Sequence, residues 1–218
     1  MGSITRSLAN NITTSGVILP AGITNASVSA VTSFANAPAG TLILLSTQTA
    51  SNSATISFTT GLDSTYDAYE FHFINIHART DNVIFQFNMS TDSGSNYNVT
   101  KTTSYFETYN NETLAVFNLE YSAAYDLAQS TAFQTLCVVS GSDADQNSGG
   151  TLQLFNPSST TYVKHFIANL NDYTYHDYSL SAFIAGYGNT TSAVNAIRFQ
   201  MSSGNFDGVI KLYGVKKS

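Results

Sequence analysis

Residues 66–90, YDAYEFHFINIHARTDNVIFQFNMS, hold the densest alternation of aromatic residues in the chain. An alternation with a period of two places such side chains on one face of a β-strand. The polar break at residues 78–82 is short enough for a hairpin loop. We therefore predict two long antiparallel strands, joined as a hairpin, whose shared aromatic face forms the centre of a β core. The alternating positions are Tyr69, Phe71 and Phe73 before the break, and Val83, Phe85, Phe87 and Met89 after it.

Short strand signals recur along the chain from Thr41 onward, and turns rich in Gly, Asn, Ser and Pro separate them. No amphipathic helix pattern lies between them, which is typical of a sandwich or barrel. We predict an all-β fold, an antiparallel two-sheet sandwich that is jelly-roll-like. The expected strands cover residues 41–49, 54–60, 66–77, 83–91, 97–106, 113–120, 131–140, 151–156, 161–169, 178–187, 194–201 and 208–215.

The last two expected strands also alternate clearly. Ile197, Phe199 and Met201 share one face of the first strand, and Ile210 and Leu212 share one face of the second. Turn residues around position 204 separate the two strands, so we predict that they form a C-terminal hairpin.

Residues 1–40 differ from the rest, because they are rich in Ser, Thr, Asn and Ala and carry a single aromatic residue. A segment with so few large apolar residues cannot fold alone. We predict an extended N-terminal arm, 1–40, that orders against a partner or sister chains, and a sandwich head, 41–218. A tail without contacts is the alternative. The arm residues expected to contact a partner are Ile4, Leu8, Ile12, Val17, Ile18, Leu19, Val28, Val31 and Phe34.

Charged residues make up only 10% of the chain, whereas roughly 25% is usual for soluble domains. The formal net charge is −6, and eight Lys and Arg residues are scattered along the sequence. Nucleic-acid binding through phosphates needs a basic patch, so no nucleic-acid partner is expected. No stretch approaches the roughly 18 apolar residues of a membrane helix, and no signal peptide is recognisable at the N-terminus. We expect no membrane partner.

No pattern predicts a metal site or a reactive thiol. Cys137 lies in an apolar run and is expected to be a small buried side chain. His72 and His77 are five residues apart, so a regular strand would place them on opposite faces. Asp143 and Asp145 alternate like the start of a calcium loop, but the later glycine and glutamate of an EF-hand are missing. A solvated turn and a loop-bound calcium ion both remain open there.

Catalytic patterns are equally weak. Glu70 is the one candidate acid on the polar face of a central strand, and nothing in the spacing pairs Glu107, Glu112 or Glu120 with another carboxylate. No G-x-S-x-G elbow or phosphate-binding glycine loop is present. We predict a protein that is not an enzyme and needs no cofactor.

A tyrosine-rich segment is the strongest candidate for ligand binding. Tyr173, Tyr175, His176 and Tyr178 group aromatic and polar side chains in an expected loop, and residues 105–111 carry a similar mixture. Tyrosine is enriched at binding surfaces, and aromatic rings beside Asn and Asp suit a sugar. The alternative is that these rings cover the ends of the sandwich core.

Four segments resemble a group of small virion proteins of tailed phages, especially phages of marine bacteria and cyanobacteria. They are MGSITRSLANNITTSGV, DSGSNYNVTKTTS, FNPSSTTYVKHF and IRFQMSSGNFDGVIKLYGVKK. The resemblance implies a β-sandwich head on an N-terminal arm, displayed on the virion surface as a capsid decoration (cement or head-fibre) protein, often as a homotrimer. Its partners would be the major capsid protein or another virion protein, and a host surface glycan in the alternative of a tail-fibre or receptor-binding module.

Overall fold

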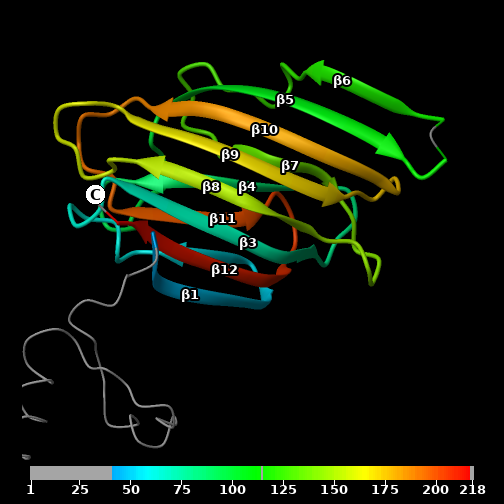
Figure 1. Ribbon diagram of the computed structural model, residues 1–218, viewed down its shortest axis with the longest axis horizontal. Helices are drawn as coiled ribbons and strands as arrows, with labels where there is room; N and C mark the ends of the chain where they lie inside the picture. The colour runs from blue at the N-terminus through cyan, green and yellow to red at the C-terminus, as the bar shows by residue number, and fades with distance from the viewer. Residues whose placement is uncertain (1–40, 114, 217–218) are drawn as a thin grey trace, which may run out of the picture. The chain divides into compact units, whose positions relative to one another are not determined.

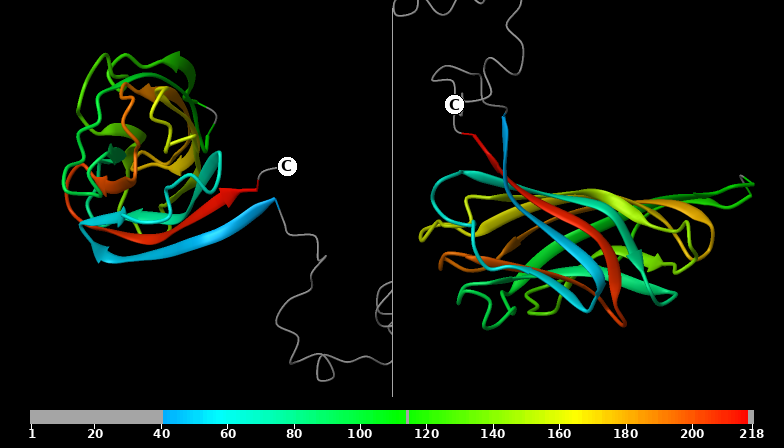
Figure 2. Two further views of the ribbon diagram at one scale, coloured as in Figure 1. Left: turned by 90° about the vertical axis from the view of Figure 1, so that its left-hand side faces the viewer. Right: turned by 90° about the horizontal axis from the view of Figure 1, so that it is seen from below.

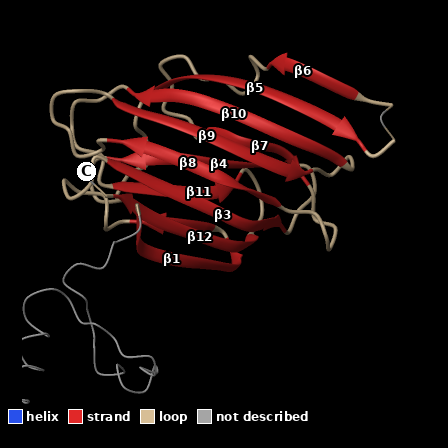
Figure 3. Ribbon diagram, viewed as in Figure 1, coloured by secondary structure: helices blue, strands red, loops and turns tan. Residues whose placement is uncertain are grey.

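A computed structural model describes residues 41–113 and 115–216, which form strands, turns and loops without any helix (Figure 3). The predicted arm, with its contact residues, lies outside the described residues. The strands are β1 (Leu42–Ser53), β2 (Thr55–Phe58), β3 (Ala68–Ala78), β4 (Val83–Ser90), β5 (Lys101–Asn111), β6 (Phe117–Tyr121), β7 (Gln134–Ser140), β8 (Ser148–Phe155), β9 (Lys164–Tyr173), β10 (Tyr178–Gly188), β11 (Ala196–Met201) and β12 (Phe206–Val215).

The strands form two antiparallel sheets (Figure 1). The larger sheet has the order β1-β12-β3-β8-β9-β10-β5-β6, and the smaller has the order β2-β11-β4-β7. Without β5, β6, β9 and β10, eight strands remain, and their chain order gives sheets 1-8-3-6 and 2-7-4-5. This is the jelly-roll arrangement, so the predicted fold class is confirmed. We call the other four strands the extension, because they continue the larger sheet beyond β8.

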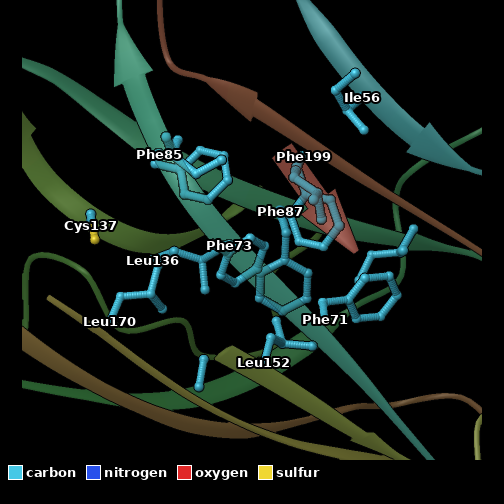
Figure 4. Close-up of a cluster of buried hydrophobic side chains, with 14 of the residues drawn as sticks. Ile56, Phe71, Phe73, Phe85, Phe87, Leu136, Cys137, Leu152, Leu170 and Phe199 are labelled. Atoms are coloured by element: carbon cyan, nitrogen blue, oxygen red, sulfur yellow. The ribbon is translucent and has the colours of Figure 1, made fainter. Parts of the chain in front are cut away.

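The core contains the predicted aromatic faces, but the hairpin predicted for residues 66–90 is wrong. β3 pairs with β12 and β8, whereas β4 pairs with β11 and β7. The two strands therefore face each other across the core, where the rings of Phe73 and Phe85 meet edge to face with centroids 5.4 Å apart (Figure 4). Alternation shows which side chains share a face, but it does not distinguish strands that lie side by side from strands that lie face to face.

The C-terminal hairpin prediction is wrong for the same reason. β11 belongs to the smaller sheet and β12 to the larger, where β12 runs beside β1 along one edge (Figure 2). The predicted faces are nevertheless correct, since Phe199 and Leu212 are both fully buried. The loop from β3 to β4 and the loop from β11 to β12 both cross between the sheets. They are neighbours, because the N–H of Arg79 in the first donates to the carbonyl of Asn205 in the second at 2.9 Å.

Candidate functional site

The outer surface of the extension carries no Asp, Glu, Lys or Arg side chain at any outward-facing position of its four strands. We call this surface the uncharged face. Interfaces are depleted in charged residues and enriched in aromatic residues relative to other surfaces, so its composition suits a contact with another molecule. It consists of His165, Ile167, Asn169, Asn171 and Tyr173 on β9; Ser179, Ser181, Phe183, Ala185 and Tyr187 on β10; Thr102, Ser104, Phe106, Thr108 and Asn110 on β5; and Phe117, Leu119 and Tyr121 on β6.

Aromatic pairs cross between strands on the uncharged face. Phe106 and Phe183 lie opposite each other on β5 and β10, and their rings stack with centroids 4.9 Å apart. His165 and Tyr187 form a second pair, with centroids 5.9 Å apart. An open hollow of about 560 Å³ lies on this part of the sheet, with small side chains such as Ala185 in its lining. The face therefore combines apolar contact area with uneven relief.

A second hollow, of about 400 Å³, lies where β9 turns into β10 beside the end of β5. We call it the end hollow. Asn171 is positioned there by β10, because its amide nitrogen donates to the hydroxyls of Ser179 at 3.1 Å and Ser181 at 3.2 Å. The lining offers amide, hydroxyl and carboxylate groups beside one aromatic ring. These residues are Asn110, Asn111, Glu112, Asn171, Asp172, Tyr173, Asp177 and Ser179.

The four residues of the predicted ligand loop are divided between two places. Tyr173 lines the end hollow. Tyr175, His176 and Tyr178 instead form a row of rings, with successive centroids 4.5 Å and 5.7 Å apart. Tyr178 then stacks on Tyr109, with centroids 5.6 Å apart, and Tyr109 packs against the core. The row therefore connects to the core through Tyr109, whereas Tyr173 lines the end hollow.

Backbone hydrogen bonds connect this loop to β7 and to the start of β10. The carbonyl of the buried Thr174 accepts from the N–H of Asp177 at 2.9 Å. The N–H of Thr174 donates to the carbonyl of Tyr178 at 3.0 Å. The N–H of Tyr175 donates to the carbonyl of Val139 at 2.8 Å. Val139 has φ 50°, a left-handed value that costs a β-branched residue about 1–3 kcal/mol. Strain at β7 thus accompanies the attachment of the loop.

The end hollow is acidic. Burial raises the pKa of Tyr173, and the nearby carboxylates of Asp177 and Glu112 raise it further. The Asp172 side chain points instead into the sandwich, where its Oδ2 accepts from the hydroxyl of Ser140 at 3.1 Å and burial raises its pKa to about 8. Asp172 Oδ1 has no hydrogen-bond partner among the described residues. Because Glu112 and Asp177 lie in its lining, the end hollow favours ligands rich in hydroxyl donors and disfavours anions.

Glu70, the candidate catalytic acid, is engaged through both of its oxygens. His72 Nε2 lies 2.6 Å from Glu70 Oε1, and the amide of Gln153 donates to Glu70 Oε2 at 3.0 Å. His72 also contacts the ring of Tyr213, with centroids 4.7 Å apart. These contacts form a polar row across three strands of the larger sheet, with the carboxylate fixed by its neighbours.

The structure pairs two glutamates that the sequence spacing left apart. β5 and β6 form a hairpin in which Glu107 lies directly opposite Glu120. Burial raises the pKa of Glu107, and the Glu120 carboxylate raises it further. The expected strands 97–106 and 113–120 leave out Glu107 and place the loop too early in the chain for this register. Neither glutamate lines either of the two hollows described above. The absence of enzymatic activity stays a prediction.

His72 and His77 lie on the same face of β3, whereas a regular strand would place them on opposite faces. Asn75 adopts φ 51°, and the pairing of β3 with β8 shifts between Phe73 and Ile76. This bulge adds one residue and turns His77 to the outer side, where its Nδ1 lies 2.7 Å from the carbonyl of Gln146. In residues 41–113 and 115–216, no group of three or more His, Cys, Asp or Glu side chains could hold a metal ion.

Lys101 and Lys164 are fully buried, which was not predicted from the sequence. Lys101 Nζ donates to Asn88 Oδ1 at 2.6 Å and to the carbonyl of Val99 at 2.8 Å, and burial lowers its pKa to about 7. Lys164 Nζ donates to the carbonyl of Tyr162 at 2.6 Å. Both lie on inward positions of the extension, where a lysine has no local sequence signal. Cys137 is fully buried as predicted, and burial raises the pKa of its thiol well above the usual value.

Comparisons of this chain with protein-family models, with curated proteins and with solved structures found no match. The resemblance to phage virion proteins therefore rests on the four sequence segments, and a phage origin stays a prediction. The described part of the chain includes no helix long and apolar enough to cross a membrane.

Proposed function

We propose that this chain is a non-enzymatic surface protein of a phage particle, a capsid decoration protein that its N-terminal arm anchors and whose jelly-roll head is exposed. Its partners are then a major capsid protein, or another virion protein, and further copies of itself. The observation that carries the proposal is the uncharged face. A protein of net charge −6 can pack closely against neighbours over such a surface without desolvating charged groups.

The fold and composition support the same function. Jelly rolls occur in viral capsid proteins and lectins, which act by assembling or binding. Aromatic pairs such as Phe106 with Phe183 supply contact area on the uncharged face. An arm that orders only on its partner adds many contacts, and display of several copies adds avidity.

A binding assay with undecorated capsids tests this proposal. We expect the full chain to bind capsids, and a variant without residues 1–40 to lose binding while its circular dichroism keeps the β signature. Ile167→Glu should weaken binding, because it places a charge on the uncharged face. The matched control is Ser203→Glu, in an exposed turn between β11 and β12. Unchanged capsid binding by the truncated chain would disprove anchoring by the arm.

A host glycan is the second candidate ligand, and the end hollow is the observation that favours it. Amide and carboxylate groups beside the ring of Tyr173 match the hydroxyls and the apolar face of a sugar. On a glycan array, or with intact host cells, Tyr173→Ala and Asn171→Ala should reduce binding. The control is Tyr162→Ala, an exposed tyrosine in the loop between β8 and β9. Cell binding that survives removal of residues 1–40 would favour a receptor-binding head over capsid decoration.

A further inference from the structure

β6 has the reverse polarity of an ordinary surface strand. Its outward side chains Phe117, Leu119 and Tyr121 are 76%, 70% and 57% exposed, whereas Asn118 and Glu120 point to the inner side. A strand usually turns its apolar face to the core and its polar face to water. The apolar stripe on β6 is therefore a surface that contact with another molecule would cover.

β6 is also an edge strand, because it pairs with β5 alone. Two backbone bonds fix the pattern of this pairing: the N–H of Ser122 donates to Tyr105, and the N–H of Asn111 donates to Val116. Hydrogen-bonded pairs alternate in an antiparallel ladder. The backbone groups of Phe117, Leu119 and Tyr121 therefore point to the free edge, and an edge of this kind is a template for another strand.

We propose that β6 pairs with β6 of a second copy of this chain, antiparallel, across a two-fold axis at Leu119. In this register Phe117 lies opposite the partner's Tyr121, and Leu119 lies opposite the partner's Leu119. The apolar stripes of the two copies become neighbours on one face of a continuous sheet. The same patch contacts itself, as a two-fold interface requires.

The inner side of β6 favours this register over one with the axis at Glu120. Glu120 is the one charged residue within the strand Phe117–Tyr121. A two-fold axis at Leu119 places it opposite the partner's Asn118, so an amide meets a carboxylate. An axis at Glu120 would instead place two carboxylates face to face, which is destabilising. Asn118 already donates to Glu120 within one copy at 2.9 Å, so the two groups are compatible neighbours.

The space beside the stripe can accept a partner side chain. A hollow of about 660 Å³ lies over β5 and β6, with Thr108, Asn110, Phe117 and Leu119 in its lining. Its edges are uncharged, so an aromatic ring from the second copy could enter without desolvating a charge. Side-chain packing thus adds to the backbone pairing at the strand edge.

A cysteine on the axis tests the proposal in the full chain. Leu119→Cys should form a disulfide-linked dimer on mild oxidation, because residue 119 would lie opposite itself at a distance a disulfide can span. The native Cys137 is fully buried, so it does not compete. The control is Tyr162→Cys, an exposed position far from β6 in the sequence, which should stay monomeric on a non-reducing gel. Equal cross-linking of both variants, or none at position 119, would overturn the proposal.

A second measurement covers association without a cross-link. Sedimentation of the wild type should show a dimer or another even-numbered assembly, and Leu119→Lys should convert it to a species with half the number of copies. The melting curve of the monomeric unit should not change, because the side chain is exposed. A monomer at all concentrations, or a trimer that Leu119→Lys leaves intact, would contradict the proposal. Its outcome is independent of capsid binding, so failure of the proposed function would not affect it.

Discussion

The centre of the jelly roll and the extension have opposite kinds of interior. The centre is aromatic: the ring centroid of Phe199 lies 5.1–6.3 Å from the centroids of several other phenylalanine rings. The inner side of the extension instead buries two lysines and two acidic side chains, which are Lys101, Lys164, Glu107 and Asp172. We therefore expect packing to dominate the stability of the centre, and the protonation of buried groups to affect the stability of the extension.

The largest effect is expected at the centre. Phe199→Ala removes a fully buried ring that contacts Phe71, Phe73 and Phe85. The lost burial and the remaining cavity should lower the free energy of unfolding by about 3–5 kcal/mol, measured by denaturant unfolding. The matched substitution Phe106→Ala, on the exposed face, should cost clearly less. Equal losses at both positions would contradict a packing-dominated centre.

A pH-dependent effect is expected at Asp172. Its pKa is about 8 in the folded state and near 4 in the unfolded state. As pH rises between these values, the unfolded chain releases the proton first, so the free energy of unfolding falls. Asp172→Asn should match the wild type near pH 4 and be more stable by roughly 2–4 kcal/mol at pH 9. If the free energies of unfolding of the variant and the wild type change with pH in the same way across this range, Asp172 is not a buried neutral carboxyl.

Lys101 should show the opposite dependence. Its pKa is about 7 in the folded state and near 10.4 in the unfolded state. Between these values the unfolded chain holds the additional proton, so the free energy of unfolding rises with pH. Lys101→Met should remove this rise, and its stability relative to the wild type should fall by roughly 2 kcal/mol from pH 6 to pH 10. Urea titrations at several pH values measure the free energy of unfolding. If it still rises with pH in Lys101→Met, another group is responsible for the pH dependence.

The smallest effect is expected on the uncharged face. Ile167 is 53% exposed, so Ile167→Ser should change the free energy of unfolding by no more than about 0.5 kcal/mol. Thermal unfolding measures it. A large loss would mean that this residue serves the fold itself, which would weaken its assignment to an interface.

The positions of the strands and the faces of their side chains could be predicted from the local sequence. Each of the twelve strands overlaps a predicted one, and the alternating apolar residues of β3, β4, β11 and β12 are buried as expected. These properties are local, because a pleated backbone alternates its side chains between two faces whatever strand lies beside it. The candidate role of Tyr173 was likewise visible from its segment.

Which strands are neighbours depends on the tertiary structure. Hydrogen bonds between distant segments placed β3 opposite β4 rather than beside it, and brought Glu107 opposite Glu120. A single added residue at Asn75 moved His77 to the face of His72. The burial of Lys101 and Asp172 and the reversed polarity of β6 also depend on the sheet around them. Pairing and burial are properties of the assembled sheets, because they result from contacts between residues far apart in the chain.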